Sequence, residues 1–152
     1  MIINTKVGEI TLGYKNGALF CEFGKHKVEK EPSKKLSKQL FDYFSGKKIQ
    51  KFDAPLSSGP LFTQQCWKAC RSIPYGKTIT YAELAKRAGS PKAMQAAGQA
   101  MRNNPLTIIT PCHRVISSSG LLHGYSGVTN PQSKELKRKQ YLLDLEKGIM
   151  MS

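Results

Sequence analysis

The chain has 152 residues, of which 39% are hydrophobic, and its formal net charge at pH 7 is +14. This length allows one ordinary domain, or two small domains that share an interface. The positive charge predicts association with polyanions, above all nucleic acid, with an anionic membrane surface as the competing partner. The sequence contains neither a long apolar run nor a secretory signal, so we expect no membrane span and no membrane partner. We place the protein inside the cell, in the cytoplasm or, in a eukaryote, the nucleus.

Residues 2–23 are predicted to form β-strands. Ile10, Leu12 and Tyr14 alternate along one face of the first long strand. Asn16-Gly17 then supplies the positive φ angles that a tight hairpin turn requires, so the next strand should return beside the first. A basic, polar linker follows over residues 24–32.

A helix is predicted from a cap at Ser33 to about Ser45, with Gly46 closing it. Its apolar side chains recur at helical spacing and form one stripe: Leu36, Leu40, Phe41 and Phe44. The first half of the chain therefore reads as a small α/β unit. It contains no recognisable catalytic constellation, and we assign it the role of a scaffold.

The connector over residues 47–60 is rich in proline, serine and glycine, which favours a domain boundary there. We divide the chain into a small α/β domain (1–54), a linker (55–60) and a second domain (61–152). The first 60 residues have a net charge of +5 and the remainder a net charge of +9.

Three helices are predicted in the first part of the second domain. One covers about residues 63–72, and a capping box at Thr80 and Glu83 opens another over 81–88. Ser90 is expected to cap a third, with Pro91 in its first position, that runs to about residue 102. The last two form a helix-turn-helix, or alternatively an ordinary αα-hairpin. Small residues dominate the third helix, which suits close approach to a ligand or tight helix packing.

The final helix is predicted to begin at residues 130–133 and to end at Gly148. Its apolar face contains Leu136, Leu142, Leu143 and Leu145. The basic run over residues 137–139 is expected to be a solvated face, with a phosphate contact as the alternative.

Four cysteines are present: Cys21, Cys66, Cys70 and Cys112. None forms a Cys-x-x-Cys pair, which argues against a zinc ribbon or a redox dithiol. Cys66 and Cys70 lie one helical turn apart and are interpreted as core residues, with a disulfide or half of a metal site as the alternatives. We expect reduced thiols, no metal and no cofactor.

Cys112 follows an apolar, β-prone run over residues 106–111 and is followed at once by His113. Pro111 restricts the backbone before the thiol. A neighbouring imidazole can lower the pKa of a thiol and make it a nucleophile. The alternative is a packed cysteine beside a satisfied histidine.

Short motifs occur in a fixed order on both sides of Cys112 and His113. They are Ile73-Pro74-Tyr75-Gly76, Thr80-Tyr81, Gly98, Met101-Arg102-Asn103-Asn104-Pro105, Pro111-Cys112-His113-Arg114-Val115, Ser119-Gly120 and Gly124-Tyr125-Ser126-Gly127. In this order they resemble the O6-alkylguanine-DNA alkyltransferases. The resemblance implies an α/β, ribonuclease-H-like N-terminal domain and a mainly α C-terminal domain with a helix-turn-helix. It also implies DNA repair by irreversible transfer of an alkyl group from guanine O6 to the protein's own cysteine, in a single turnover.

The resemblance assigns catalytic roles to five side chains. Cys112 would attack the alkyl carbon, His113 would act as a base through a water, and Glu146 would orient the imidazole. Asn104 would brace the active-site loop. Tyr81 would donate a hydrogen bond or proton to N3 of the leaving guanine.

The resemblance also assigns the base pocket. Met101 and Tyr125 would form its walls, and backbone groups near Cys112, Val115 and Ser126 would hydrogen-bond the guanine edges. The lesion lies within double-stranded DNA, so the base must be flipped out of the helix.

The resemblance further implies that the helix-turn-helix enters the minor groove, with Ala96, Ala97 and Gly98 of the small-residue helix allowing close approach. We expect the protein to bind as a monomer. Arg102 matches one family arginine. The arginine that fills the vacated stack in many members is replaced here by Gln95, seventeen residues before the cysteine. We therefore expect weaker or altered base extrusion.

Other functions fit the residues less well. Alkyltransferase-like proteins bind alkyl lesions without chemistry, but they lack the cysteine that stands here as Cys112. A helix-turn-helix regulator would need a further domain that the sequence does not show, and a thiol hydrolase would need a peptide or acyl site.

Overall fold

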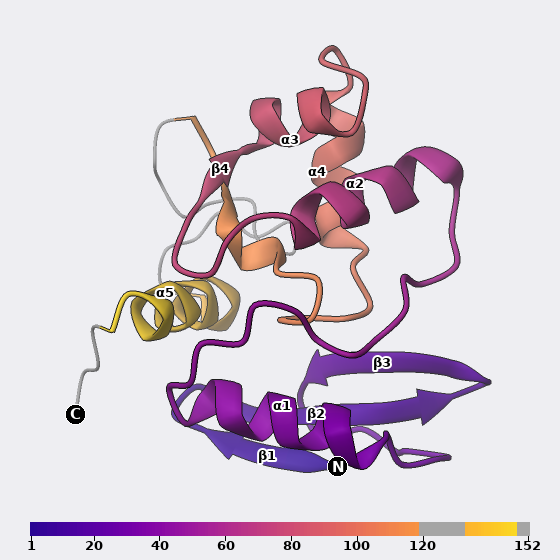
Figure 1. Ribbon diagram of the computed structural model, residues 1–152, viewed down its shortest axis with the longest axis vertical. Coiled ribbons are helices and arrows are strands. Elements are labelled where there is room, and N and C mark those ends of the chain that lie inside the picture. Colours follow the sequence, from indigo (N-terminus) through magenta and orange to yellow (C-terminus); the bar gives the residue numbers. More distant parts are fainter. Residues whose placement is uncertain (119–132, 149–152) are drawn as a thin grey trace.

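The computed structural model describes residues 1–118 and 133–148. Figure 1 shows a sheet and one helix in one layer and a group of helices in a second layer. The elements in chain order are β1 (Ile2–Thr5), β2 (Gly8–Lys15), β3 (Ala18–Phe23), α1 (Lys34–Phe44), α2 (Leu61–Arg71), β4 (Ile79–Thr80), α3 (Tyr81–Arg87), α4 (Met94–Arg102), the 3-10 turn η1 (Cys112–Arg114), β5 (Val115–Ile116) and α5 (Lys134–Glu146).

The N-terminal strands form an antiparallel sheet in the order β1-β2-β3. Asn16 and Gly17 have φ angles of 53° and 75°, so the predicted hairpin turn is confirmed. Leu12 pairs with Cys21 across the β2–β3 ladder, and both side chains are fully buried. The face that bears them packs on α1 and begins the lower core.

Helix α1 begins as predicted, because Ser33 Oγ accepts a hydrogen bond of 3.1 Å from the backbone N–H of Leu36. The predicted apolar stripe is wrong at one position, since Phe41 is 59% exposed. Tyr43 is fully buried instead, seven residues after Leu36 on the same face. A polar hydroxyl therefore enters the interior from this helix.

The C-terminal helices α2, α3 and α4 pack together around a second apolar core. Thr80 caps α3 as predicted, accepting a hydrogen bond of 3.1 Å from the Glu83 N–H. The predicted start of α4 is wrong. Ser90 to Ala93 form a turn, closed by a 2.9 Å hydrogen bond from the Ala93 N–H to the Ser90 carbonyl, and the helix begins at Met94. Pro91 suits the second position of such a turn as well as the first turn of a helix.

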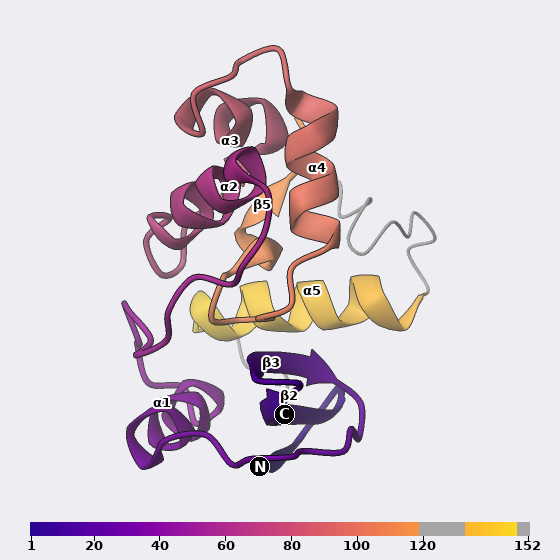
Figure 2. The ribbon, with the colours of Figure 1, turned by 90° about the vertical axis from the view of Figure 1, so that its right-hand side faces the viewer.

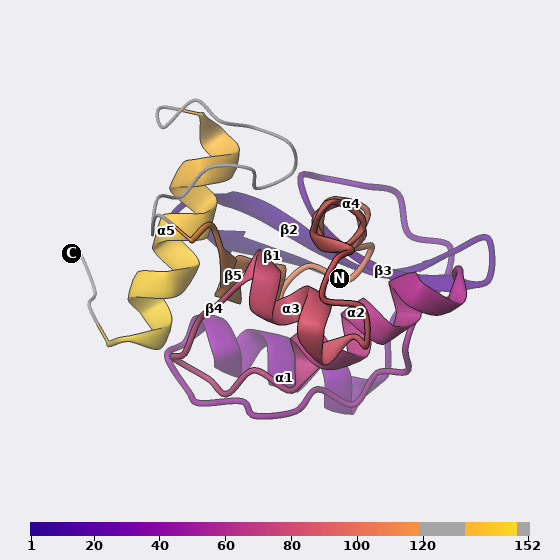
Figure 3. The same ribbon diagram turned by 90° about the horizontal axis from the view of Figure 1, so that it is seen from above.

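Helix α5 lies at the level between the two layers, along one side of the molecule (Figures 2 and 3). Its four predicted leucines are all buried. The prediction of a solvated basic face is wrong for Lys139, which is fully buried and donates a 2.7 Å hydrogen bond to the Val115 carbonyl. Arg138 also turns inward, with its Nε donating to the Val7 carbonyl at 3.1 Å. A helix wedged between two layers leaves little of its circumference for solvent.

The lower core is completed by residues from the C-terminal half. Leu106, Ile108, Leu142 and Leu145 pack with the sheet and α1 in one cluster. Residues 46–60, between α1 and α2, contain no helix or strand. The two halves are therefore joined by shared apolar packing, and the domain limits 1–54, 55–60 and 61–152 stay a prediction. In the described part of the chain no helix is long and apolar enough to cross a membrane.

Candidate active site

A short loop between α4 and η1 presents Cys112. Asn104 holds this loop from within: its Oδ1 accepts a 2.9 Å hydrogen bond from the Leu106 N–H, and its Nδ2 donates to the Thr110 carbonyl at 2.7 Å. The β-prone run does not form a strand; it makes isolated bridges only, and Ile108 has a φ of 75°. Positive φ is strained for a β-branched residue. The loop is thus a fixed, bent connection.

Cys112 opens η1 and is 6% exposed. Its backbone N–H donates to the Thr110 carbonyl at 2.8 Å, so the braced loop also holds the thiol-bearing residue. None of the four cysteines forms a disulfide. Burial raises the pKa of Cys66 to about 11 and the pKa values of Cys21 and Cys70 further still, so these three remain thiols at neutral pH.

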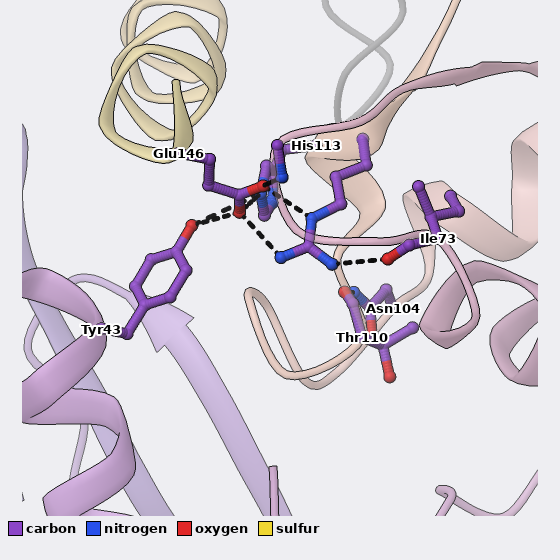
Figure 4. Close-up of polar contacts among 8 residues, drawn as sticks. Tyr43, Ile73, Asn104, Thr110, His113 and Glu146 are labelled. Carbon is purple, nitrogen blue, oxygen red and sulfur yellow. Dashed lines mark hydrogen bonds and ion pairs between the residues drawn. The ribbon is translucent and has the colours of Figure 1, made fainter. Parts of the chain in front are cut away.

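His113, the next residue, is fully buried beside Glu146 of α5 (Figure 4). Its Nε2 lies 2.5 Å from Glu146 Oε2. Burial lowers the pKa of His113, and the charges of Arg114 and Lys139 act in the same direction against the opposing effect of Glu146. The imidazole is therefore neutral at pH 7. A carboxylate can only accept, so Nε2 carries the proton and Nδ1 keeps a lone pair.

The carboxylate of Glu146 receives donors from four residues. Arg114 binds both oxygens, with Nε at 2.7 Å from Oε1 and Nη2 at 3.0 Å from Oε2. The Gly76 N–H donates to Oε1 at 3.0 Å, and the Tyr43 hydroxyl donates to Oε2 at 2.6 Å. Burial alone would disfavour the carboxylate, but His113 and Arg114 outweigh it and hold the pKa of Glu146 well below its usual range. Glu146 is thus a fixed anion at neutral pH.

Two members of this network are absent from the predicted site. Arg114 was visible in the motif after the cysteine, but nothing local showed that its guanidinium would pair with residue 146. Tyr43 lies in the half of the chain predicted to be a scaffold, but its hydroxyl also contacts Glu146 of the candidate site. The one sequence signal for Tyr43 was its position on the Leu36–Leu40 face of a helix, where a buried tyrosine needs a partner for its hydroxyl.

Tyr81 lies at the first position of α3, with the Lys139 ammonium 5.8 Å from the centre of its ring. Burial raises the pKa of Tyr81 to about 12, and the charge of Cys112 acts in the same direction. Burial lowers the pKa of Lys139 to about 8. Tyr81 is therefore a protonated phenol at neutral pH, close enough to Cys112 to feel its charge.

A pocket of about 780 Å³ opens beside Tyr81. Its walls include Gln95, Ala96, Gly98, Arg102 and Ser117, chiefly from one face of α4. Ala97, also predicted to allow close approach of DNA, does not line this pocket, because its side chain is fully buried against the other helices. A Cβ added at Gly98 would meet no described atom within 4 Å, so packing within the described residues does not require glycine there.

The remaining predicted pocket residues are placed as follows. Met101 is 6% exposed and lies in the same apolar cluster as Cys112. Val115 is fully buried, and it pairs with Ile79 in the parallel β4–β5 ladder. Tyr125 and Ser126 lie outside the described residues. Across residues 1–118 and 133–148, no group of three or more His, Cys, Asp or Glu side chains could hold a metal ion.

Comparison with known proteins agrees with this arrangement. Residues 61–148 match the family model described as 6-O-methylguanine DNA methyltransferase, DNA binding domain. A methylated-DNA–protein-cysteine methyltransferase of Methanosarcina acetivorans is 40% identical over 95% of this chain and 96% of its own length. The crystal structure of Mycobacterium tuberculosis O6-methylguanine methyltransferase has a TM-score of 0.77 and 35% identity, covering 99% of this chain and 93% of the other. The same organism's OGT in complex with DNA gives a TM-score of 0.76 and 34% identity, covering 99% and 94%. The chain therefore belongs to the 6-O-methylguanine DNA methyltransferase family.

Proposed function

We propose that this protein repairs DNA by moving an alkyl group from O6 of an alkylated guanine directly to Sγ of Cys112. The observation that carries the proposal is a neutral, buried His113, the residue that follows this cysteine in the chain, which Glu146 holds in one tautomer. A thioether is not hydrolysed under neutral conditions, so we propose that each molecule acts once.

In the proposed transfer, the proton of the Cys112 thiol passes through a water to Nδ1 of His113. Nδ1 is buried and has no hydrogen-bond partner within the described residues, and such a nitrogen calls for one. The thiolate then forms the S–C bond as the C–O6 bond breaks, and the electron pair of that bond goes to the guanine. The imidazolium that results is stabilised by the Glu146 carboxylate.

The leaving guanine gains negative charge, and we assign Tyr81 to stabilise it by donating a hydrogen bond or its proton to N3. Its raised pKa keeps the phenol protonated at neutral pH. The buried ammonium of Lys139 lies over the same ring, so it would favour any negative charge that develops on the phenol oxygen. Met101, Tyr125 and the backbone near Val115 and Ser126 stay proposals as the pocket's walls and edges.

The proposed partner is duplex DNA, bound by a monomer in the minor groove with the damaged base flipped out. Helices α3 and α4 would act as the helix-turn-helix. The exposed face of α4, with Gln95, Ala96, Gly98 and Arg102, lines the pocket beside Tyr81, which supports this orientation. For the N-terminal half, the antiparallel order β1-β2-β3 followed by a helix supports a ribonuclease-H-like relationship.

The intact mass of the protein tests the function. After incubation with a short duplex that contains O6-methylguanine, we expect a gain of one methyl group per chain that stops at stoichiometric conversion. Peptide mapping should place the methyl group on Cys112. Tight binding to the lesion with an unchanged mass would instead identify a lesion-binding protein without transfer chemistry.

Gly98→Ala is expected to separate stability from repair. Alanine is favoured over glycine inside a helix by about 1 kcal/mol, and the added methyl group meets no described atom, so the variant should be equally or more stable. The same methyl group would obstruct close approach of DNA, so the transfer rate on duplex DNA should fall. The rate with free O6-methylguanine base is the control, and equal rates on duplex DNA for the variant and the wild type would contradict this orientation of α4.

Gln95→Arg is expected to speed repair of duplex DNA by up to about tenfold, since extrusion of a base costs a few kcal/mol and arginine would add a charged filler for the gap. Single-turnover rates on duplex and single-stranded substrates measure the effect, which should be confined to the duplex. Gln99→Arg adds the same charge one turn further along α4, on the wall of the same pocket, and is the control for added charge on this face of the helix. A gain no larger on the duplex than on the single strand would exclude the wedge role.

A further inference from the structure

The Tyr43 hydroxyl brings the N-terminal half of the chain into the active site. Tyr43 is fully buried on α1, and its hydroxyl donates to Glu146 Oε2 at 2.6 Å across the interface between the halves (Figure 4). The ring is held by edge contacts with Phe44 and Tyr75, whose ring centres lie 5.4 and 6.2 Å away. This packing holds the ring that carries the hydroxyl.

The Tyr43 hydroxyl shares an oxygen with the catalytic dyad. Glu146 Oε2 accepts from Tyr43 and from His113 Nε2 at once, and the two donors lie 3.4 Å apart. Burial and the negative charge of Glu146 both raise the pKa of Tyr43, so the phenol stays protonated, and towards the carboxylate it can only be the donor. This oxygen also accepts from Arg114 Nη2 at 3.0 Å. Each further donor on a carboxylate oxygen draws charge from it and weakens the attraction of that oxygen for an imidazolium.

We infer that Tyr43 is a positioning residue of the alkyl transfer, which sets the proton affinity of the His113–Glu146 pair from the N-terminal half. With the hydroxyl in place, Glu146 orients His113 but raises its basicity less. The imidazole therefore stays neutral until it accepts the proton of the thiol. The inference rests on the proposed role of His113 as that base.

Other charged or titratable groups also act on this pair, and all of them must stay constant in a test. Arg114 belongs to η1, Tyr75 precedes β4, and Lys139 lies on α5 two turns before Glu146. Their electrostatic effects reach Glu146, His113 or Tyr43. Tyr43→Phe leaves each of them in place and retains the buried ring, so it removes the single hydroxyl.

The pH profile of Tyr43→Phe tests the inference. In the pH profile of the single-turnover rate, the acid limb reports protonation of His113, and we expect its midpoint to move to higher pH by about half to one unit. On the alkaline side of this limb, the rate of the variant should lie within about twofold of the wild-type rate. The ring-nitrogen NMR titration of His113 should show the same upward shift. A merely structural defect would lower the rate at every pH and leave the midpoint where it was.

Tyr141→Phe is the matched control, because Tyr141 packs against the same lower cluster from α5 and should leave both midpoints unchanged. Unchanged midpoints in Tyr43→Phe, by rate and by NMR, would overturn the inference. Absence of methyl uptake by the wild type would instead contradict the proposed function, and the NMR titration would still report on Tyr43 independently of transfer.

Discussion

Cys112→Ala is expected to abolish methyl uptake completely while leaving lesion binding and the fold intact. The side chain is small and 6% exposed, and the loop that presents it is braced by Asn104 through backbone groups that the substitution does not touch. The pocket beside Tyr81 is likewise unaltered. Loss of the Cys112 sulfur, the proposed methyl acceptor, should therefore abolish methyl transfer and leave binding of the lesion unchanged.

The most demanding control is Cys70→Ala. Cys70 is fully buried in the same cluster, and the charge of Cys112 contributes to its raised pKa, so it is a thiol near the reactive one. Burial keeps it protonated, and a protonated thiol is a poor nucleophile. We expect Cys70→Ala to take up one methyl group per chain, as the wild type does. Methyl uptake by Cys112→Ala, at Cys70 or elsewhere, would show that the acceptor has been misassigned.

Local rules predicted the local features of this fold well. The Asn16-Gly17 turn and the caps at Ser33 and Thr80 all depend on groups a few residues apart, which a sequence displays directly. The start of α4 was wrong because Ser90 and Pro91 suit two local structures equally, and the choice between them depends on how α4 packs. Motif order predicted the family, which the comparisons confirm.

The resemblance also implied that Glu146 orients His113, and the structure brings these two side chains together. The other long-range contacts of the site were not predictable in this way. The hydroxyl of Tyr43 reaches Glu146 across 103 positions in the sequence, and burial of Lys139 follows from the placement of α5 between two layers. Periodicity assigns a face to such residues but not a partner on another element. A lysine in a basic run is most often solvated, and only the packed structure shows that this one points inward.

These long-range contacts also tie the two halves of the chain together. The Glu146 carboxylate accepts from α1, from the turn before β4 and from η1, so one anion joins segments from both halves of the chain. The apolar cluster below it has the same mixed origin, since Leu142 and Leu145 of α5 pack on the N-terminal sheet and helix. The apolar packing and the hydrogen-bond network of the candidate site therefore share the same interface.

Glu146→Gln is expected to have large effects on both stability and rate. The amide cannot balance the guanidinium of Arg114, which is 3% exposed, and breaking one partner of a buried ion pair costs about 3–5 kcal/mol. The NH2 group of the amide can also donate to the Tyr43 hydroxyl or to His113 Nε2, so the tautomer of His113 is no longer fixed. We expect the transfer rate to fall by about 10²–10⁴, the usual contribution of a general base. Asp144→Asn, the same chemical change two residues earlier on α5, should alter neither quantity much.

The pH dependence of that stability loss distinguishes the buried anion from a simple packing defect. The pKa of Glu146 in the folded protein is depressed below its ordinary value of 4.5, so its stabilising contribution is complete above that pH and is lost as pH falls towards the folded pKa. Urea unfolding of wild type and Glu146→Gln should therefore give a large, constant difference in unfolding free energy from about pH 5 to about pH 7, and a difference that shrinks steadily below about pH 4.5. A packing defect would instead keep the same difference at every pH at which both proteins fold, because the glutamine side chain and the cavity around it do not titrate.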